Sequence, residues 1–185
     1  CVRPGSDPAE VRISRASAPD TEDRVLRADG QPTPAEFMGC SGTERLDFSR
    51  DGNRLFLEGR YACEGGQERT VTGIMALTSW DEWVEIRAVE AQGEQVAWVQ
   101  QFVESSPAAV QSAGEVDLVT PETVLARRLA ARSIDVDELR EASERVAPEA
   151  VSAWVVQMGT PFDLDAQTLL AMAGAWGLCS IPTFG

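Results

Sequence analysis

Hydrophobic and polar residues alternate along the middle of the chain, from about residue 44 to residue 103. Leu46 and Phe48 are separated by Asp47, and Leu55 and Leu57 continue the alternation after a short polar stretch. A repeat of two is typical of β-strands that bury one face. The middle of the chain is therefore predicted to form an antiparallel sheet.

Asp51-Gly52 predicts where the first pair of strands turns, because both residue types tolerate the positive φ angles of a two-residue hairpin turn. A turn centred there pairs residues whose numbers sum to 103. This register sets Leu46 opposite Leu57, so that apolar side chains meet across the two strands.

The same register pairs Cys40 with Cys63. Opposed residues of an antiparallel pair have Cα atoms about 4.5–5.5 Å apart, which is within the range of a disulfide. We therefore predict a Cys40–Cys63 disulfide that closes the hairpin. A redox-active role for the pair is disfavoured, because no basic group close in sequence lowers a thiol pKa.

Glycine-containing turns at 65–66 and 92–93 divide the rest of this region, so that residues 38–104 are predicted to hold about five antiparallel strands. Short turns between successive strands favour a meander or a small open barrel. Residues 1–37 are rich in proline and small polar residues, and we expect an extended tether with at most a short edge strand.

Residues 105–116 form a predicted linker, after which the apolar spacing becomes helical. Cap signals predict helices that begin at Thr120-Pro121, at Asp135, at Pro148 and near Asp163. Residues 117–185 are thus expected to be a compact unit of about four short helices with an apolar tail. The predicted fold class is α+β, with a β unit followed by a helical unit.

Composition narrows the possible chemistry, because all sixteen basic residues are arginine and the chain has neither lysine nor histidine. Catalytic triads, Schiff bases, histidine-containing zinc sites and P-loops each need one of the missing side chains. No metal site or cofactor is expected. The sequence favours a protein that is not an enzyme.

The net charge of −14 indicates which kinds of partner the protein can bind. Binding to nucleic acid or to anionic lipid needs a basic surface, so neither is predicted. The same acidic field favours a cationic protein partner.

Two D-x-D pairs, at 135–137 and 163–165, suggest calcium. Neither pair has the glycine and glutamate frame of an EF-hand loop, and capping of helices explains these carboxylates better.

Five tryptophans could build a sugar-binding platform or a partner contact, although packing in the core is the default interpretation. We single out Trp154 and Trp176 as candidates for contact with another protein. Ile181 and Phe184 join them, because an apolar tail is expected to dock on a surface.

Cys1 begins the chain and precedes a polar stretch, which resembles a mature bacterial lipoprotein. The resemblance implies a lipid anchor on Cys1 and a periplasmic, membrane-anchored protein. If Cys1 carries no lipid, a bridge from Cys1 to Cys179 becomes possible. No apolar run reaches the roughly 18 residues of a spanning helix, so an anchor or a partner is needed for membrane attachment.

Two stretches resemble uncharacterised exported proteins of GC-rich bacteria. In the β unit these are Asp51-Gly52, residues 63–66, and residues 73–79 with Trp83; in the helical unit they are residues 153–154, 159 and 162–170. The resemblance implies export and carries no activity.

The leading functional hypothesis is an accessory or structural subunit that docks on a membrane-embedded protein complex. An electron-transfer or photosynthetic complex would suit an acidic exported protein, because such complexes meet cationic redox carriers. The alternative is a periplasmic ligand-binding module that uses the concave face of the β unit. A carboxylate-based hydrolase is the weakest interpretation.

Overall fold

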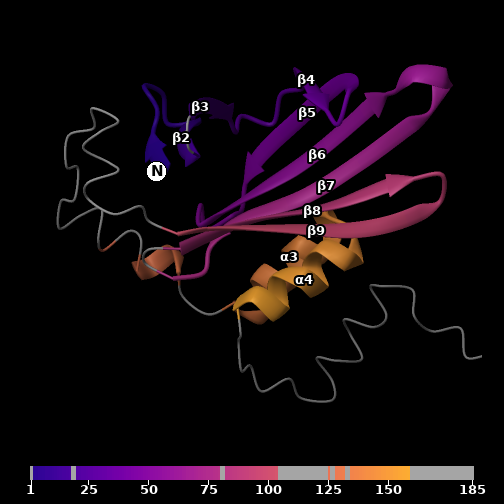
Figure 1. The fold of residues 1–185 in the computed structure, drawn as a ribbon. Helices are drawn as coiled ribbons and strands as arrows, with labels where there is room; N and C mark the ends of the chain where they lie inside the picture. The colour runs from indigo at the N-terminus through magenta and orange to yellow at the C-terminus, as the bar shows by residue number, and fades with distance from the viewer. Residues whose placement is uncertain are drawn as a thin grey trace, which may run out of the picture.

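Antiparallel sheets followed by short helices make up the fold in the computed structural model, which describes residues 2–17, 20–79, 82–103, 125, 128–131 and 134–158 (Figure 1). The class is α+β. The strands are β1 (Val2–Pro4), β2 (Glu10–Ser17), β3 (Asp20–Arg27), β4 (Thr33–Phe37), β5 (Cys40–Phe48), β6 (Arg54–Ala62), β7 (Glu68–Leu77), β8 (Glu82–Ala91) and β9 (Glu94–Val103). The helices are η1 (Glu64–Gly66), α3 (Val136–Arg145) and α4 (Pro148–Met158).

The large sheet is a meander, with the strand order β4-β5-β6-β7-β8-β9 and every pair antiparallel. Each strand lies beside the next one in the sequence because short turns join them. The register of β5 and β6 confirms the predicted pairing, with Leu46 opposite Leu57. The predicted hairpin at Gln92-Gly93 is also confirmed, since Ala91 pairs with Glu94 across it.

The turn between β5 and β6 differs from the expected two-residue type, although its register is right. Ser49 and Arg54 close a four-residue loop through the Ser49 N–H and the Arg54 carbonyl, 2.9 Å apart. Inside the loop, the Asp51 carboxylate accepts a hydrogen bond from the Ser49 hydroxyl and another from the Asn53 backbone N–H. Partial burial raises the pKa of Asp51, but these bonds outweigh it and hold the pKa well below its usual range. The carboxylate therefore organises a wider loop than the Asp-Gly pair alone predicts.

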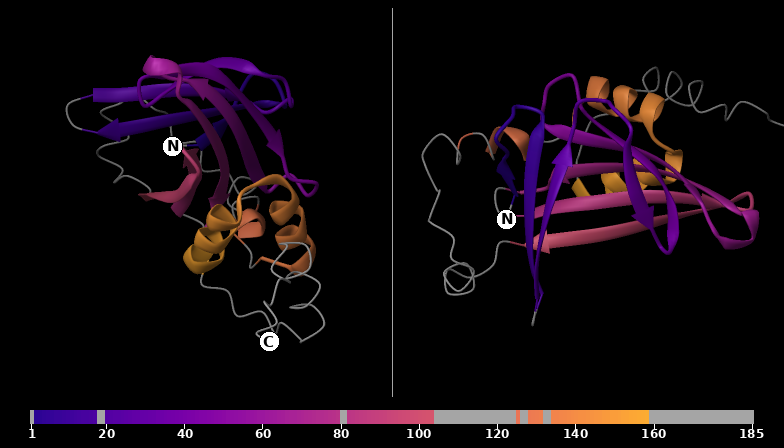
Figure 2. Two further views of the ribbon diagram at one scale, coloured as in Figure 1. Left: turned by 90° about the vertical axis from the view of Figure 1, so that its right-hand side faces the viewer. Right: turned by 90° about the horizontal axis from the view of Figure 1, so that it is seen from above.

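Helices α3 and α4 cover one face of the large sheet, which we call the helix face (Figures 1 and 2). Asp135 begins α3 with a capping box, in which its carboxylate accepts the Glu138 N–H and the Glu138 side chain accepts the Asp135 N–H. This confirms that Asp135 caps a helix. The core on this face joins Phe56, Ile74, Val84 and Ile86 of the sheet to Leu139, Ala142, Val151 and Trp154 of the helices.

Charged side chains of α3 attach the helix to the β5–β6 loop. The Glu141 carboxylate accepts the Arg50 backbone N–H at 3.2 Å, and Arg145 pairs with Asp47 at 3.0 Å. The guanidinium of Arg145 also lies 4.6 Å from the centre of the Phe56 ring. These contacts fix the position of α3 at one end of the sheet.

Trp154 is completely buried in the core of the helix face, with the Arg54 guanidinium 5.7 Å from its ring. A side chain in this position offers no surface to another protein, so the interpretation of Trp154 as a partner contact is corrected. Trp154 packs in the core, as the default interpretation of the tryptophans expected, because α4 turns its most apolar side toward β7 and β8.

Strands β1, β2 and β3 form a second, small sheet in the segment that was expected to be a tether. Ile13 and Leu26 of this sheet are buried in a second core, on the face of the large sheet that points away from the helices. We call this the hollow face. The segment has more regular structure than its proline content predicts, because Pro4 and Pro34 lie in the edge strands β1 and β4, where a missing N–H is tolerated.

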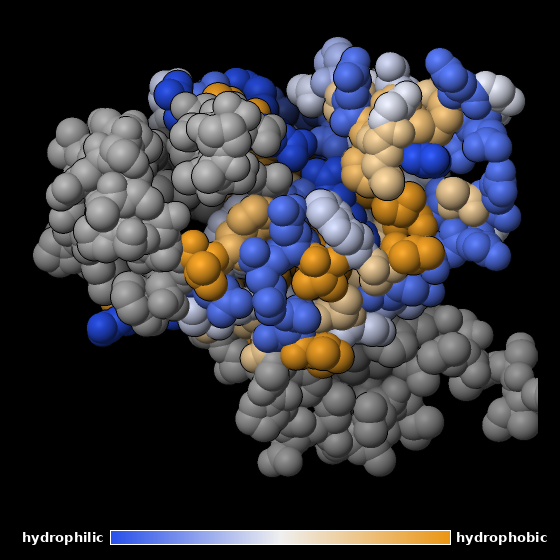
Figure 3. All heavy atoms as spheres, viewed as in Figure 1, coloured by the Kyte–Doolittle hydropathy of each residue, from blue (hydrophilic) through white to orange (hydrophobic). Residues whose placement is uncertain are grey.

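Several sequence predictions lie wholly or largely outside the described residues. They include the linker at 105–116, most of the helix expected from Thr120, and the helix expected near Asp163 with the apolar tail. The surface seen in Figure 3 mixes hydrophilic side chains with small groups of hydrophobic ones over the described residues.

The Cys40–Cys63 disulfide is present, with the Cα atoms 4.3 Å apart and a sequence separation of 23. Closing a loop of this length stabilises the folded state by about 3 kcal/mol in the chain-entropy model. We expect the double variant Cys40→Ala/Cys63→Ala to lose about this much free energy of unfolding in urea titrations. A loss below about 1 kcal/mol would show that the β5–β6 hairpin is held by its core alone.

Candidate functional site

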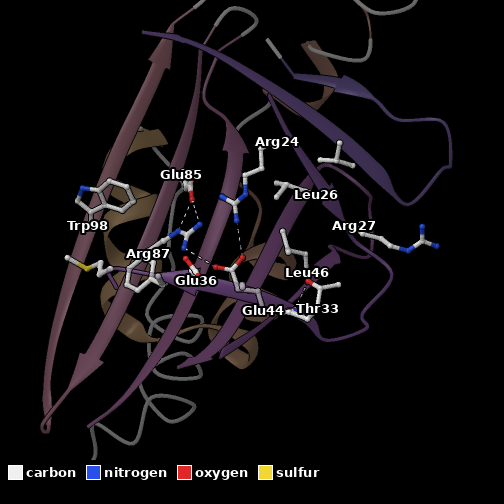
Figure 4. Close-up of a pocket in the computed structure, with 15 residues that line it drawn as sticks. Arg24, Leu26, Arg27, Thr33, Glu36, Glu44, Leu46, Glu85, Arg87 and Trp98 are labelled. Atoms are coloured by element: carbon white, nitrogen blue, oxygen red, sulfur yellow. Dashed lines mark hydrogen bonds and ion pairs between the residues drawn. The ribbon is translucent and has the colours of Figure 1, made fainter. Parts of the chain in front are cut away.

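A hollow of about 520 Å³ opens on the hollow face, between the small sheet and the large one. Its walls come from two groups of consecutive strands, β3 to β5 and β8 to β9, which lie far apart in the sequence (Figure 4). The lining residues are Arg24, Val25, Leu26 and Arg27 of β3, Thr33 to Phe37 of β4 with Met38, Glu44 and Leu46 of β5, Glu85 and Arg87 of β8, and Trp98 of β9.

A chain of four alternating charges lies in this hollow. Arg24 pairs with Glu44 at 2.9 Å, Glu44 with Arg87 at 3.2 Å, and Arg87 with Glu85 at 2.7 Å. Glu44, Glu85 and Arg87 are each at most 5% exposed, whereas the Arg24 side chain is 30% exposed. The chain of charges therefore runs from a buried end at Glu85 to an accessible end at Arg24 (Figure 4).

Tyr61 adds a neutral donor to the same cluster, since its hydroxyl donates a hydrogen bond to Glu44. Gly59 stands opposite Glu44 in the register and makes this possible. A Cβ atom at Gly59 would lie 2.7 Å from the Tyr61 ring, so only glycine lets the ring lie back along β6 toward Glu44. The Tyr61 hydroxyl thus joins Arg24 and Arg87 as a donor to the buried Glu44 carboxylate.

The alternation of the strands explains why these charges point inward. Glu44 is in phase with Leu46, so it faces the same side as the second core. Arg87 is opposite Trp98 in the register, and directly opposed residues share a face of the sheet. The central part of β8 is buried on both faces, so its charged positions cannot reach solvent.

Exposed apolar side chains stand at the rim of the hollow. Met38 is 73% exposed and Trp98 is 46% exposed. Met38 also has a φ angle of 48°, in the left-handed region that a methionine adopts at a cost of about 1 kcal/mol or more. The hollow thus combines a buried ionic end with an apolar rim.

Phe37 connects the rim to the ionic end. Its ring centre lies 5.3 Å from the Arg87 guanidinium and 5.4 Å from the Tyr61 ring centre. The aromatic rings and the ion pairs hold each other in place, so the site is formed before any ligand arrives.

The two buried carboxylates of the hollow do not form a catalytic pair. The Arg87 guanidinium lies between Glu44 and Glu85 and binds both of them. General acid–base chemistry needs a carboxylate that faces the reacting group, and here each faces an arginine. Both carboxylates therefore serve to hold the Arg87 guanidinium.

Among the sequence-predicted site residues, the structure brings Cys40 and Cys63 together as predicted. Cys1, Trp176, Ile181 and Phe184 lie outside the described residues. Sequence reasoning missed Arg24, Glu44, Glu85 and Arg87. One signal was available, because Glu44 occupies an inward position of an alternating strand.

No family model matches the chain, and no curated protein or solved structure matches it either. The site is therefore interpreted from its geometry. None of the described helices has the length and apolar character needed to cross a membrane. Within the same described residues, no cluster of acidic or thiol side chains is arranged to hold a metal ion.

Tyr61 gives the site a measurable pH dependence. Its burial, and then the Glu44 carboxylate that accepts its hydrogen bond, raise the pKa of Tyr61 above its ordinary value of about 10. The folded protein therefore holds the phenolic proton more tightly than the unfolded chain. This stabilisation is fully present below about pH 10 and is lost as pH rises toward the raised pKa.

We expect the free energy of unfolding to fall with pH above about pH 10, and the slope to disappear in Tyr61→Phe. Urea titrations at several alkaline pH values measure both quantities. The chain is favourable for this test because it has one tyrosine and no lysine. An equal slope in the variant would assign the alkaline loss to another group.

Proposed function

We propose that this chain is an exported binding module that holds a small amphipathic molecule in the hollow. The observation that carries the proposal is the combination of a preformed ionic end, buried at Glu44 and Arg87, with the exposed apolar rim of Met38 and Trp98. The volume of about 520 Å³ is in the range of small-molecule sites.

Two further features support this proposal. The buried ion pairs fix the shape of the hollow, so little entropy is lost when a ligand enters. The Cys40–Cys63 disulfide favours an oxidising compartment, which supports export.

The neutral fluorescent probe N-phenyl-1-naphthylamine tests the proposal, because its emission increases in an apolar site. We expect saturable binding of one probe per chain. Met38→Asn should weaken binding about tenfold, which corresponds to the loss of roughly 60 Å² of apolar contact.

Gln92→Asn is the matched control, since Gln92 also precedes a glycine in a two-residue turn and has a φ angle of 57°. Asparagine tolerates the left-handed region, so both variants should be as stable as the wild type or more stable, by up to about 1 kcal/mol. Only Met38→Asn should weaken the probe. Equal affinities in the two variants, or no saturable binding, would refute the proposal.

Strand β9 favours a second candidate function, that of an accessory subunit docked on a membrane protein complex. It is an edge of the large sheet, and it carries no charged residue between Gln95 and Val103. Val96 and Val103 are 63% and 74% exposed. Edges of this kind usually carry charges that prevent pairing with other strands, so an unprotected edge suits the addition of a partner's strand.

A charge on this edge tests the second candidate. In membranes extracted with mild detergent, the native protein should migrate within a defined larger complex, and Val103→Lys should release it. Val156→Lys is the control, because Val156 is 75% exposed on α4. A native protein that migrates alone would exclude the accessory role.

A further inference from the structure

We infer that the ligand of the hollow is a monoanionic amphiphile, with a carboxylate head group that binds Arg24 and an apolar body that lies against Met38 and Trp98. This inference rests on the proposed binding function and adds the chemical class of the ligand.

The order of the charges indicates the sign of the head group. From the buried end outward the sequence is Glu85, Arg87, Glu44 and Arg24, so the charges alternate and the accessible end is a cation. A ligand that continues the alternation is an anion. A cationic head group at the same place would face Arg24 at close range, where repulsion is poorly screened.

Arg24 has the donors that such a head group needs. It uses one nitrogen, Nη2, to bind Glu44 at 2.9 Å, and it has no second partner among the residues that the structure describes. A guanidinium presents several N–H groups in a planar fork, which matches the two oxygens of a carboxylate. Because its side chain is 30% exposed, these groups are accessible from the hollow.

The other arginines of the hollow are occupied. Arg87 is bound between two carboxylates. Arg27 lies near three acidic side chains, Asp29 at 2.5 Å, Glu10 at 3.6 Å and Asp7 at 3.7 Å. Arg24 is therefore the cation of the hollow with the greatest capacity for an added anion.

Glu36 is the competing group, because this exposed acidic residue is also part of the lining and would attract a cation. In β4, however, Thr33, Ala35 and Phe37 are the partly buried positions, and Glu36 is on the alternate, exposed side. A head group at Glu36 would remain in water, where an ion pair contributes little. A head group at Arg24 lies nearer the buried end.

The balance of charge favours one negative charge over two. The cluster of Arg24, Glu44, Arg87 and Glu85 is neutral, and the three arginines and three glutamates that line the whole hollow also cancel. A dianion such as a phosphate monoester would double its repulsion from Glu44 along with its attraction to Arg24, while the cost of removing it from water rises with the square of its charge. A single carboxylate is therefore the best match.

Three probes of equal chain length test the head group: decanoate, 1-decanol and decylammonium. Each displaces N-phenyl-1-naphthylamine from the protein at concentrations below micelle formation. We expect decanoate to displace the probe at about tenfold lower concentration than decanol, and decylammonium to be the weakest.

Variants of Arg24 test the residue. Arg24→Gln should reduce the preference for decanoate over decanol to about twofold or less, with the affinity for decanol unchanged, whereas Arg24→Lys should keep part of the preference. Arg27→Gln is the matched control, because Arg27 also lines the hollow. It should keep the full preference, since the Arg27 guanidinium already lies near three acidic side chains. Binding of decanol by every variant shows that each is folded.

The outcomes separate this inference from the proposed function. Equal displacement by decanoate and decanol refutes the anionic head group but leaves the binding function intact. Strongest displacement by decylammonium would assign the head group to Glu36. A preference for decanoate that Arg24→Gln does not reduce would refute the role of Arg24, and a failure of the fluorescent probe itself to bind would refute the proposed function.

Discussion

The ion pairs of Arg87 determine how the side chains of the hollow face are arranged. A guanidinium that is 5% exposed is stable only with carboxylates beside it, and Glu44 and Glu85 supply them on both sides. Removing one member would leave a buried charge without its partner, at a cost of about 3–5 kcal/mol. The hollow is therefore a fixed feature, because its shape follows from charges that cannot be moved independently.

The two faces of the large sheet perform different tasks. On the helix face, apolar side chains of β7 and β8 pack against α3 and α4 to form one of the two buried cores. On the hollow face, the small sheet covers only part of the surface, so that polar and apolar residues meet at an opening. The helix face thus contributes packing alone, whereas the hollow face combines a second core with an opening.

The disulfide cross-links two of the strands that form the site. Cys40 and Cys63 join the ends of β5 and β6, the strands that carry Glu44 and Tyr61. Met38 stands two residues before Cys40, so the same cross-link holds the strained turn at the rim. An oxidising compartment would therefore support the hollow directly as well as the overall stability.

Local patterns were sufficient for much of the β unit. The period of two, the position of Asp51-Gly52 and the spacing of the cysteines predicted the hairpin register and the disulfide, because strand pairing follows a simple sum of residue numbers. Asp135 was likewise predicted as a helix cap from its neighbours alone. The loop between β5 and β6 was wider than predicted, since side-chain bonds of Asp51 compete with the two-residue turn.

The candidate site could not be predicted in the same way. Arg24 lies in β3 of a second sheet that the proline-rich sequence did not indicate, and nothing in the sequence states that β3 returns across the hollow face to reach Glu44. Trp154 could be assigned to the core only once α4 was placed against the sheet. The sequence by itself determined the hairpins around Asp51-Gly52 and Gln92-Gly93, their register and the disulfide, because these depend on neighbours along the chain and across one turn. Only the tertiary structure decided which charges meet in the hollow, because pairing there depends on how two sheets fold over each other.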